Sequence, residues 1–188
     1  MNYFLIHPLI KKVVISMFEF IKKIDYKILK FINKKIKNKT LDKIMPFITW
    51  LGNGGIIWFV ITLIMFKQPE YKKDSILIVL SLACSTVIVE GIIKPIVRRT
   101  RPFFQEDEEV ELLIKKPITY SFPSGHSASS FSVATVFIRR LIPFTSVVVI
   151  LAILISFSRL YLNVHYPTDV ICGGVIGSIC GVIITTLF

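Results

Sequence analysis

The chain has 188 residues, enough for one domain, and 53% of them are hydrophobic, with a mean hydropathy of +0.68. Only 19% of the residues are charged, and they cluster between long runs almost free of charge, which excludes an ordinary soluble domain and indicates a membrane protein. The net charge of +11 comes without any nucleic-acid motif, so we expect the lysines beside apolar runs to meet anionic lipid headgroups and expect no nucleic-acid partner.

The first predicted element is a basic amphipathic helix over residues 13–36. Apolar residues recur there at the three- and four-residue spacing of a helix: Val14, Met17, Ile21, Ile24, Ile28 and Phe31. Lysines fill much of the remainder, and charge is costly in hydrocarbon, so we expect this helix to lie in the membrane interface. The alternative is a short first span over residues 3–20, which would bury Lys11 and Lys12.

Five apolar runs follow, and they predict an all-α, polytopic helical bundle of five spans, or six if the N-terminal segment inserts. The predicted spans are 44–66, 75–93, 124–142, 143–162 and 167–187. Residues 52–55, Gly-Asn-Gly-Gly, predict a kink or a short entry helix in the first span. In the last span Gly173, Gly177 and Gly181 share one helix face, where another helix of this chain or of a second subunit can pack closely.

The three cysteines, Cys84, Cys172 and Cys180, all lie inside apolar runs. Their odd number and the lack of nearby histidine argue against a disulfide framework and a zinc site. We expect them to be small buried hydrophobic residues. The N-terminus lacks the pattern of a signal peptide, because its lysines follow its first apolar residues.

Three polar blocks flank the predicted spans, and the alternation of the spans places all three on one side of the membrane. The blocks are Lys94 with Arg101-Pro102, then Pro123-Ser124-Gly125-His126, then Ser158-Arg159 with His165 and Asp169. Arginine and lysine suit phosphate oxygens, and the free N–H groups of Ser124 and Gly125 at a helix start can point at an anion. The blocks therefore predict a phosphate-binding site.

Two histidines within these blocks add chemistry to the predicted anion site. Neutral imidazole is a competent nucleophile toward phosphorus, and Asp169, four residues after His165, can fix the tautomer of that ring. His126 could protonate the leaving oxygen and then activate water. His7 has no such neighbours and is expected to be incidental. A lipid-binding protein or transporter would use the same cations but leave both histidines and Asp169 without a role.

The three blocks, in this order and at these separations, resemble the three-part signature of the type 2 phosphatidic acid phosphatase (PAP2) superfamily. The resemblance covers residues 94–169, and the surrounding spans extend it from residue 44 to the end. It predicts an N-terminal segment over residues 1–43 and a PAP2-type domain over 44–188. It also implies a membrane phosphatase that needs no metal or other cofactor.

The resemblance assigns a role to each matching residue. His165 attacks phosphorus, Asp169 orients it, and His126 is first the acid and then the base. The phosphate and its growing charge are held by Lys94, Arg101, Ser124, Gly125 and Arg159.

Acidic residues near the signature carry separate expectations. Glu90 lies four residues before Lys94, the favourable order for a helical ion pair, and we expect it to orient that lysine. A glutamate that snorkels to the interface is the alternative. The acidic run 106–111 is expected to be a solvated loop, although it could also screen the phosphate site or cover a bound headgroup.

The substrate class and the orientation are less constrained by the sequence. The compact length and the Lys/Ile-rich composition favour a polyprenyl diphosphate such as undecaprenyl diphosphate, while phosphatidic acid, phosphatidylglycerol phosphate and a lipid A phosphate stay open. The resemblance implies an active site on the outer face of the cell membrane. Residues 1–43, with eleven lysines against three acidic residues, oppose this on the positive-inside rule unless a sixth span moves the first lysines across. The sequence does not indicate which oligomeric state the protein adopts.

Overall fold

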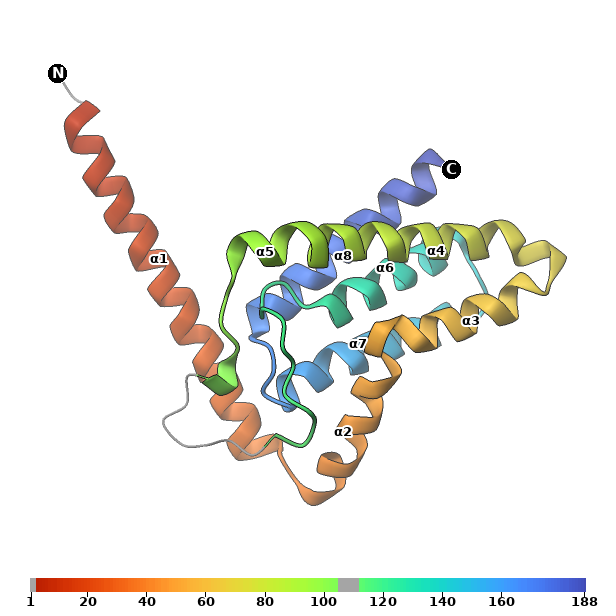
Figure 1. The fold of residues 1–188 in the computed structure, drawn as a ribbon, viewed down its shortest axis with the longest axis horizontal. Helices are drawn as coiled ribbons and strands as arrows, with labels where there is room; N and C mark the ends of the chain where they lie inside the picture. Colours follow the sequence, from red (N-terminus) through yellow and green to blue (C-terminus); the bar gives the residue numbers. More distant parts are fainter. Residues whose placement is uncertain (1–2, 105–111) are drawn as a thin grey trace.

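A computed structural model describes residues 3–104 and 112–188, which form helices and no strand (Figure 1). The acidic run 106–111 lies outside these residues. The α-helices are α1 (Tyr3–Phe31), α2 (Lys39–Leu51), α3 (Ile56–Phe66), α4 (Lys72–Thr86), α5 (Lys94–Val97), α6 (Gly125–Arg140), α7 (Thr145–Tyr161) and α8 (Pro167–Leu187). Short π or 3₁₀ turns join them: η1 (Ile32–Ile36), η2 (Asn53–Gly55), η3 (Pro69–Tyr71), η4 (Val87–Ile93) and η5 (Pro102–Phe104).

Two helical stretches are long and apolar enough to cross a bilayer, Pro69–Val97 and Pro167–Leu187. The pair α2 and α3 forms a third candidate span, bent by 51° at η2. The helices at the other two predicted spans, α6 and α7, have only 16 and 17 residues. The protein is therefore an all-helical membrane protein with two or three candidate spans by length and composition in the described residues.

The bend between α2 and α3 confirms the predicted break at residues 52–55. Gly54 and Gly55 both have positive φ, of 57° and 74°, which glycine adopts without steric cost. A second irregularity, the π turn η4, comes just before Pro95. Proline lacks an N–H and clashes with the carbonyl four residues earlier, and a wider turn relieves both problems. This turn lets the long helix continue to Lys94 and the site.

Helix α6 lies at the centre of the bundle and packs most extensively against α8. The glycine face of α8 is in direct contact with α6: a Cβ atom added at Gly173 would overlap the Ser124 carbonyl, and one at Gly177 the Ala128 carbonyl. The glycine stripe therefore serves packing within this chain, one of the two possibilities left open by the sequence. The main core gathers around Trp58, Ile78, Val133, Val136, Ala152 and Ile155. The three cysteines are free, with Cys180 buried and the other two half-buried.

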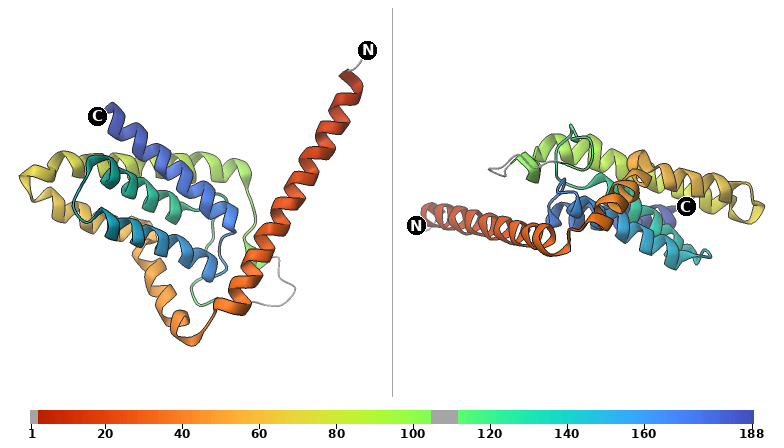
Figure 2. Two further views of the ribbon diagram at one scale, coloured as in Figure 1. Left: turned by 180° about the vertical axis from the view of Figure 1, so that it is seen from behind. Right: turned by 90° about the horizontal axis from the view of Figure 1, so that it is seen from below.

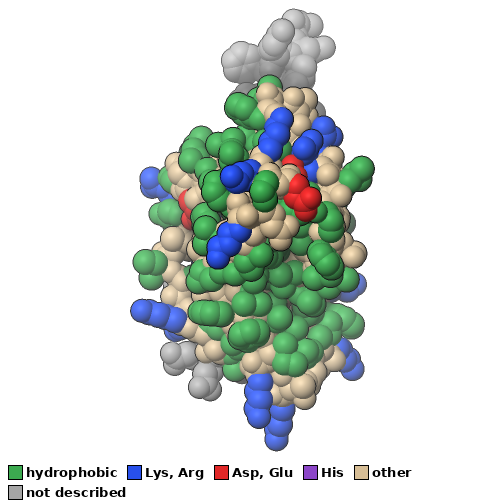
Figure 3. All heavy atoms as spheres, turned by 90° about the vertical axis from the view of Figure 1, so that its right-hand side faces the viewer, with side chains coloured by type: hydrophobic (Ala, Val, Ile, Leu, Met, Phe, Trp, Pro, Cys, Tyr) green, Lys and Arg blue, Asp and Glu red, His purple; other side chains and the backbone are tan. Residues whose placement is uncertain are grey.

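Helix α1 leans away from the bundle, and only its C-terminal part reaches the other helices (Figures 1 and 2). Its apolar stripe faces outward: Met17, Phe20 and Phe31 are 58%, 64% and 57% exposed. Figure 3 shows a broad hydrophobic surface on another face, with most Lys and Arg side chains around its edges. A small second core, which includes Ile32, Phe103 and Val164, joins the end of α1 to the loops at one end of the bundle.

Candidate active site

The three predicted polar blocks meet in one cavity of about 1130 Å³ at the end of the bundle. Its lining includes Glu90, Lys94, Arg101, Gly125, His126, Arg159 and His165. These residues come from the end of the α4–α5 stretch, the loop after it, the start of α6, the end of α7 and the α7–α8 turn. The predicted convergence on one side of the bundle is confirmed.

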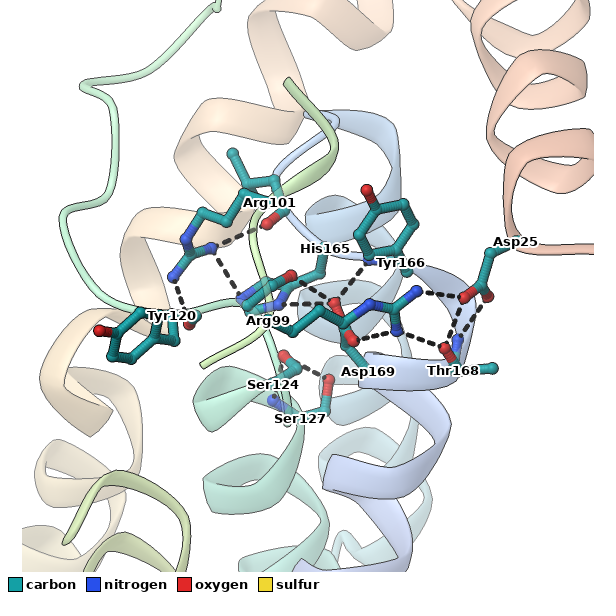
Figure 4. A network of polar contacts seen from close by, with 12 residues as sticks. Asp25, Arg99, Arg101, Tyr120, Ser124, Ser127, His165, Tyr166, Thr168 and Asp169 are labelled. Carbon is teal, nitrogen blue, oxygen red and sulfur yellow. Dashed lines mark hydrogen bonds and ion pairs between the residues drawn. The ribbon is translucent and has the colours of Figure 1, made fainter. Parts of the chain in front are cut away.

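His165 lies in the turn between α7 and α8 and is 1% exposed. Its Nε2 lies 3.1 Å from an N–H-bearing nitrogen of Arg101, and its Nδ1 lies 3.5 Å from Asp169 Oδ2 (Figure 4). A guanidinium can only donate, so Nε2 must be the acceptor and the proton of the neutral ring sits on Nδ1, toward Asp169. The ring therefore presents an unprotonated Nε2 beside the cavity.

The charges around His165 favour its neutral form. Burial, and then the positive charges of Arg101, Arg159 and Lys94, hold the pKa of His165 well below its usual value of 6.5. Burial also lowers the pKa of Arg101 to about 10, against the opposing effect of Asp169 and Glu90. At neutral pH the site therefore combines a neutral imidazole with a charged guanidinium.

Asp169 is fully buried at the first turn of α8 and has several partners. Its Oδ2 accepts hydrogen bonds from the Ser121 hydroxyl (2.5 Å) and the Tyr166 N–H (2.8 Å), and its Oδ1 accepts one from Arg99 (2.7 Å). The local sequence explains its place, because Pro167 suits the first helical position and an acidic residue two positions later can bond back to the residue that precedes the helix. The same carboxylate thus starts α8 and faces His165.

The three predicted phosphate-binding cations differ in how many donors they have free. Arg101 makes five hydrogen bonds, to Thr119, Tyr120, Val164 and His165, so all its donors are engaged. Arg159 is 3% exposed and donates to the Thr49 hydroxyl, while its buried Nε has no partner in the described part of the chain. A buried donor without a partner is costly, which marks Arg159 as the cation most ready for an anion.

Lys94 is 5% exposed, and its ammonium lies 2.5 Å from Glu90 Oε1. The predicted ion pair is therefore present, and the π turn η4 keeps the two side chains within contact despite Pro95. Glu90 itself is half-exposed at the cavity.

Of the two residues predicted to present N–H groups at the start of α6, Gly125 lines the cavity and Ser124 does not. The Ser124 N–H donates to the Asp169 main-chain carbonyl (2.9 Å), so the prediction that it points at an anion is wrong. The partner carbonyl lies on α8, and the close contact at Gly173 brings it there. The Ser124 side chain is buried and caps α6 through Ser127, whereas Gly125 lines the cavity.

His126 lies one residue into α6, and its Nε2 is 2.9 Å from Asn53 Oδ1. Asn53 belongs to the turn η2, so the break between α2 and α3 places an amide against this histidine. Both residues line the same cavity as His165. The two histidines therefore line the same cavity, as the sequence predicted.

Four polar side chains that contact the site were not predicted from the sequence: Asp25, Thr49, Asn53 and Arg99. Only Asn53 carried a signal, as a polar residue in the glycine-rich break of an apolar run. In the described residues, no group of three or more His, Cys, Asp or Glu side chains is placed to hold a metal ion.

Comparisons with known proteins find similar sequences and similar folds. The undecaprenyl-diphosphatase of Sulfolobus acidocaldarius is 31% identical over 140 residues, which cover 74% of this chain and 66% of that protein. The crystal structure of Aquifex aeolicus LpxE matches with a TM-score of 0.72 at 29% identity and covers 86% of this chain and 94% of that chain. The crystal structure of the first transmembrane PAP2 type phosphatidylglycerolphosphate phosphatase from Bacillus subtilis matches with a TM-score of 0.71 at 26% identity and covers 92% and 94%.

A model of the PAP2 superfamily matches residues 75–188, more than half of the chain. This segment holds every residue of the three signature blocks. The chain therefore belongs to the PAP2 superfamily, as a membrane phosphatase.

Proposed function

We propose that the protein hydrolyses a lipid phosphate or diphosphate through a phosphohistidine intermediate. The observation that carries this is the unprotonated Nε2 of His165, buried beside cations, with Nδ1 toward Asp169. Nε2 attacks phosphorus as the bond to the leaving oxygen breaks, and His126 gives that oxygen its proton. Water then attacks the phosphorus, His126 takes a proton from it, and the P–N bond breaks to release phosphate.

The cations hold the phosphate during both steps. Arg159 supplies its unpartnered Nε, and Lys94 supplies the donors that Glu90 leaves free. All donors of Arg101 are engaged without substrate. We therefore propose that the Arg101 N–H that donates to His165 Nε2 donates to a phosphate oxygen instead when Nε2 attacks. Gly125 lies beside the same oxygens at the start of α6, and Ser124 supports it as the residue that caps the helix. Phosphoryl transfer depends mainly on such positioning and charge stabilisation.

The cavity suits a lipid because its charged end continues into an apolar one. Trp50, Phe59, Val79, Leu82 and Val87 line the part between α2, α3 and the α4–η4 stretch. We propose undecaprenyl diphosphate as the substrate, supported by the name of the similar archaeal protein. Phosphatidic acid, phosphatidylglycerol phosphate and a lipid A phosphate are the alternatives, and all share a phosphate monoester end and long apolar chains.

We propose that residues 44–188 form the phosphatase domain with five spans, and that α1 lies along the interface. The outward-facing apolar stripe of α1 supports this, since Met17, Phe20 and Phe31 find no cover in the protein. The outer face remains the proposed side of the active site on the resemblance, although lysines 22–43 lie on that side and count against it. Ile118 is 98% exposed beside the cavity. Whole cells that carry Ile118→Cys can therefore be treated with an impermeant maleimide, and labelling is expected if the active site faces outward.

The function is tested by phosphate release in detergent micelles with excess chelator. Undecaprenyl diphosphate and phosphatidic acid are offered side by side at equal mole fraction in the micelle. We expect chelator-resistant release, faster from undecaprenyl diphosphate. Absence of release from both lipids and from the other two alternatives, by folded protein, would contradict the proposal and favour a lipid-binding role.

The pH dependence follows from the low pKa of His165. The ring attacks only when neutral, and a pKa well below 6.5 keeps it neutral into the acid range. The acid limb of kcat/KM, which reports the free enzyme, is therefore expected below pH 6.5. It is best measured with p-nitrophenyl phosphate, whose leaving group needs no proton from His126. An acid limb above pH 6.5 would argue against His165 as the nucleophile.

The ion pair of Glu90 and Lys94 gives a further prediction. In Glu90→Gln the ammonium of Lys94 loses its charged partner and is less firmly directed at the phosphate, so we expect KM to rise by about tenfold, or ~1.4 kcal/mol. The kinetics of lipid hydrolysis measure this. Glu70→Gln, at the opposite end of the long helical stretch, is the control. Unchanged KM and kcat in Glu90→Gln would leave Glu90 without an orienting role.

A further inference from the structure

Asp25 is an unexpected residue at the site, because it comes from α1 and lies among lysines in the sequence. Its side chain is nevertheless fully buried. Its Oδ1 accepts a hydrogen bond from the Thr168 N–H (3.0 Å), and its Oδ2 accepts from the Thr168 hydroxyl (2.6 Å) and from Arg99 (2.7 Å). A buried carboxylate with this many partners is a built contact and not a solvated surface charge.

The contact lies at the start of α8, next to the His165–Asp169 pair. Thr168 is the second residue of α8, so Asp25 satisfies one of the free N–H groups at that helix end, where a negative charge is favourable. Tyr26, the next residue of α1, packs edge-on against Tyr166 with ring centroids 5.9 Å apart. Helix α1 therefore holds the turn that carries His165 at two neighbouring points.

Arg99 connects Asp25 to Asp169 (Figure 4). One terminal nitrogen bonds to Asp25, and the other bonds to Asp169 Oδ1 and the Thr168 hydroxyl (2.8 Å). The guanidinium also lies over the Tyr166 ring, 3.9 Å from its centroid. Since Asp169 faces His165 with its other oxygen, the chain of contacts runs from α1 to the nucleophile.

Resting on the proposed function, we propose that Asp25 is a positioning residue of the active site, which acts through Arg99 on Asp169 and His165. Arg99 is fixed in position by its ion pairs with Asp25 and Asp169, and its positive charge interacts with both carboxylates. Asp169 then keeps enough negative charge to stabilise the positive imidazole that forms on phosphorylation. The N-terminal helix is by this inference a working part of the phosphatase as well as a membrane contact.

The test compares Asp25→Asn and Arg99→Gln with the native enzyme on p-nitrophenyl phosphate, with pH profiles of kcat/KM and separate kcat and KM. In Asp25→Asn, we expect kcat to fall about tenfold with KM within about twofold, since the misplaced groups act on the chemical step. Removing this negative charge disfavours protonated His165, so the acid limb moves to lower pH, by roughly half a unit. Arg99→Gln removes a positive charge and moves the limb to higher pH.

The other charges that face His165 are unchanged in both variants, so a shift of the limb reports the Asp25–Arg99 pair. These are the charges on Lys94, Arg101, Arg159 and Asp169, and the titratable ring of His126 also faces His165 unchanged. Asp74→Asn is the matched control, because Asp74 is a buried aspartate paired with Arg140 (2.6 Å) in the first turn of α4, at the opposite end of the long helical stretch from Lys94. Glu19→Gln, an exposed acid on α1, controls for a charge change on that helix. Both controls are expected to keep the native limb.

A purely structural contact would reduce the amount of folded enzyme and leave the acid limb in place. The limb position does not depend on how much enzyme is folded, so either variant decides the question even at low yield. A limb unmoved in both variants, with an active native enzyme, overturns the role of Asp25 and leaves the proposed function standing. A native enzyme that releases no phosphate from any phosphate ester overturns the proposed function itself.

Discussion

His165→Ala is expected to lower phosphate release by at least about 10⁴-fold, because Nε2 of His165 lies beside the cations of the cavity, whereas Nε2 of the other cavity histidine, His126, is engaged by Asn53. The loss should be the same for lipid diphosphates, lipid monophosphates and p-nitrophenyl phosphate, since all would require the same P–N bond. The protein should remain folded, because the side chain is held mainly by Arg101, which has four further bonds to the loops. Release rates in micelles and the thermal unfolding midpoint check both statements.

The covalent intermediate provides a direct readout of the same prediction. Native enzyme mixed with ³²P-labelled substrate and quenched in alkali should carry a label that is stable to base and lost in acid, as a phosphohistidine is. His165→Ala should carry none, and His7→Ala is the matched histidine control. Labelled protein in His165→Ala, or full activity in that variant, would assign the nucleophile to another residue.

Much of the site was predictable because its residues are fixed by helix ends. Alternating spans bring Lys94, Gly125, Arg159 and His165 to one end of the bundle whatever the packing in detail. The break at residues 52–55 was predictable from its glycines, and the structure uses their positive φ there. The sequence also predicted the Glu90–Lys94 pair from its spacing, which survives the π turn between them.

The contacts that the sequence could not predict depend on packing between distant elements. Arg98, Arg99 and Arg101 are three neighbouring arginines that the sequence alone does not distinguish. Arg98 adopts a left-handed conformation with φ of 50° and donates to the Pro95 carbonyl, whereas Arg99 points inward and donates to Asp169. Asp25 resembles a solvated acid among lysines until α1 is docked on α8. The Ser124 N–H is likewise taken by a carbonyl 45 positions later, which only the close approach of α6 and α8 reveals.

The number of spans illustrates a different limit. The apolar runs predicted five crossings of similar length, but α6 and α7 have 16 and 17 residues, mainly because the turn between them, with positive φ at Leu141 and Phe144, takes up residues 141–144. At the other end of the two helices, Gly125 and His126 begin α6 and Arg159 sits in the last turn of α7, so residues counted as hydrocarbon by composition line the cavity.

His126→Ala is expected to separate the two steps that His165→Ala abolishes together. With a lipid substrate the alkoxide or phosphate leaving group lacks its proton donor, and release should fall by about 10³-fold. With p-nitrophenyl phosphate the leaving group departs without a proton, so His165 can still be phosphorylated. Water then lacks its base, and the phosphohistidine should accumulate above the native level.

Two results together, a loss that depends on the leaving group and an accumulated phosphohistidine, are expected only if His126 acts first as an acid and then as a base. A residue that only binds phosphate would slow both substrates alike and trap nothing, as we expect for Arg159→Gln. Asn53→Ala, which removes the partner of His126 Nε2, should show the same pattern as His126→Ala in weaker form. Equal losses with both leaving groups and no accumulated phosphohistidine in His126→Ala would move His126 to the group of phosphate-binding residues and leave the protonation of the lipid to water.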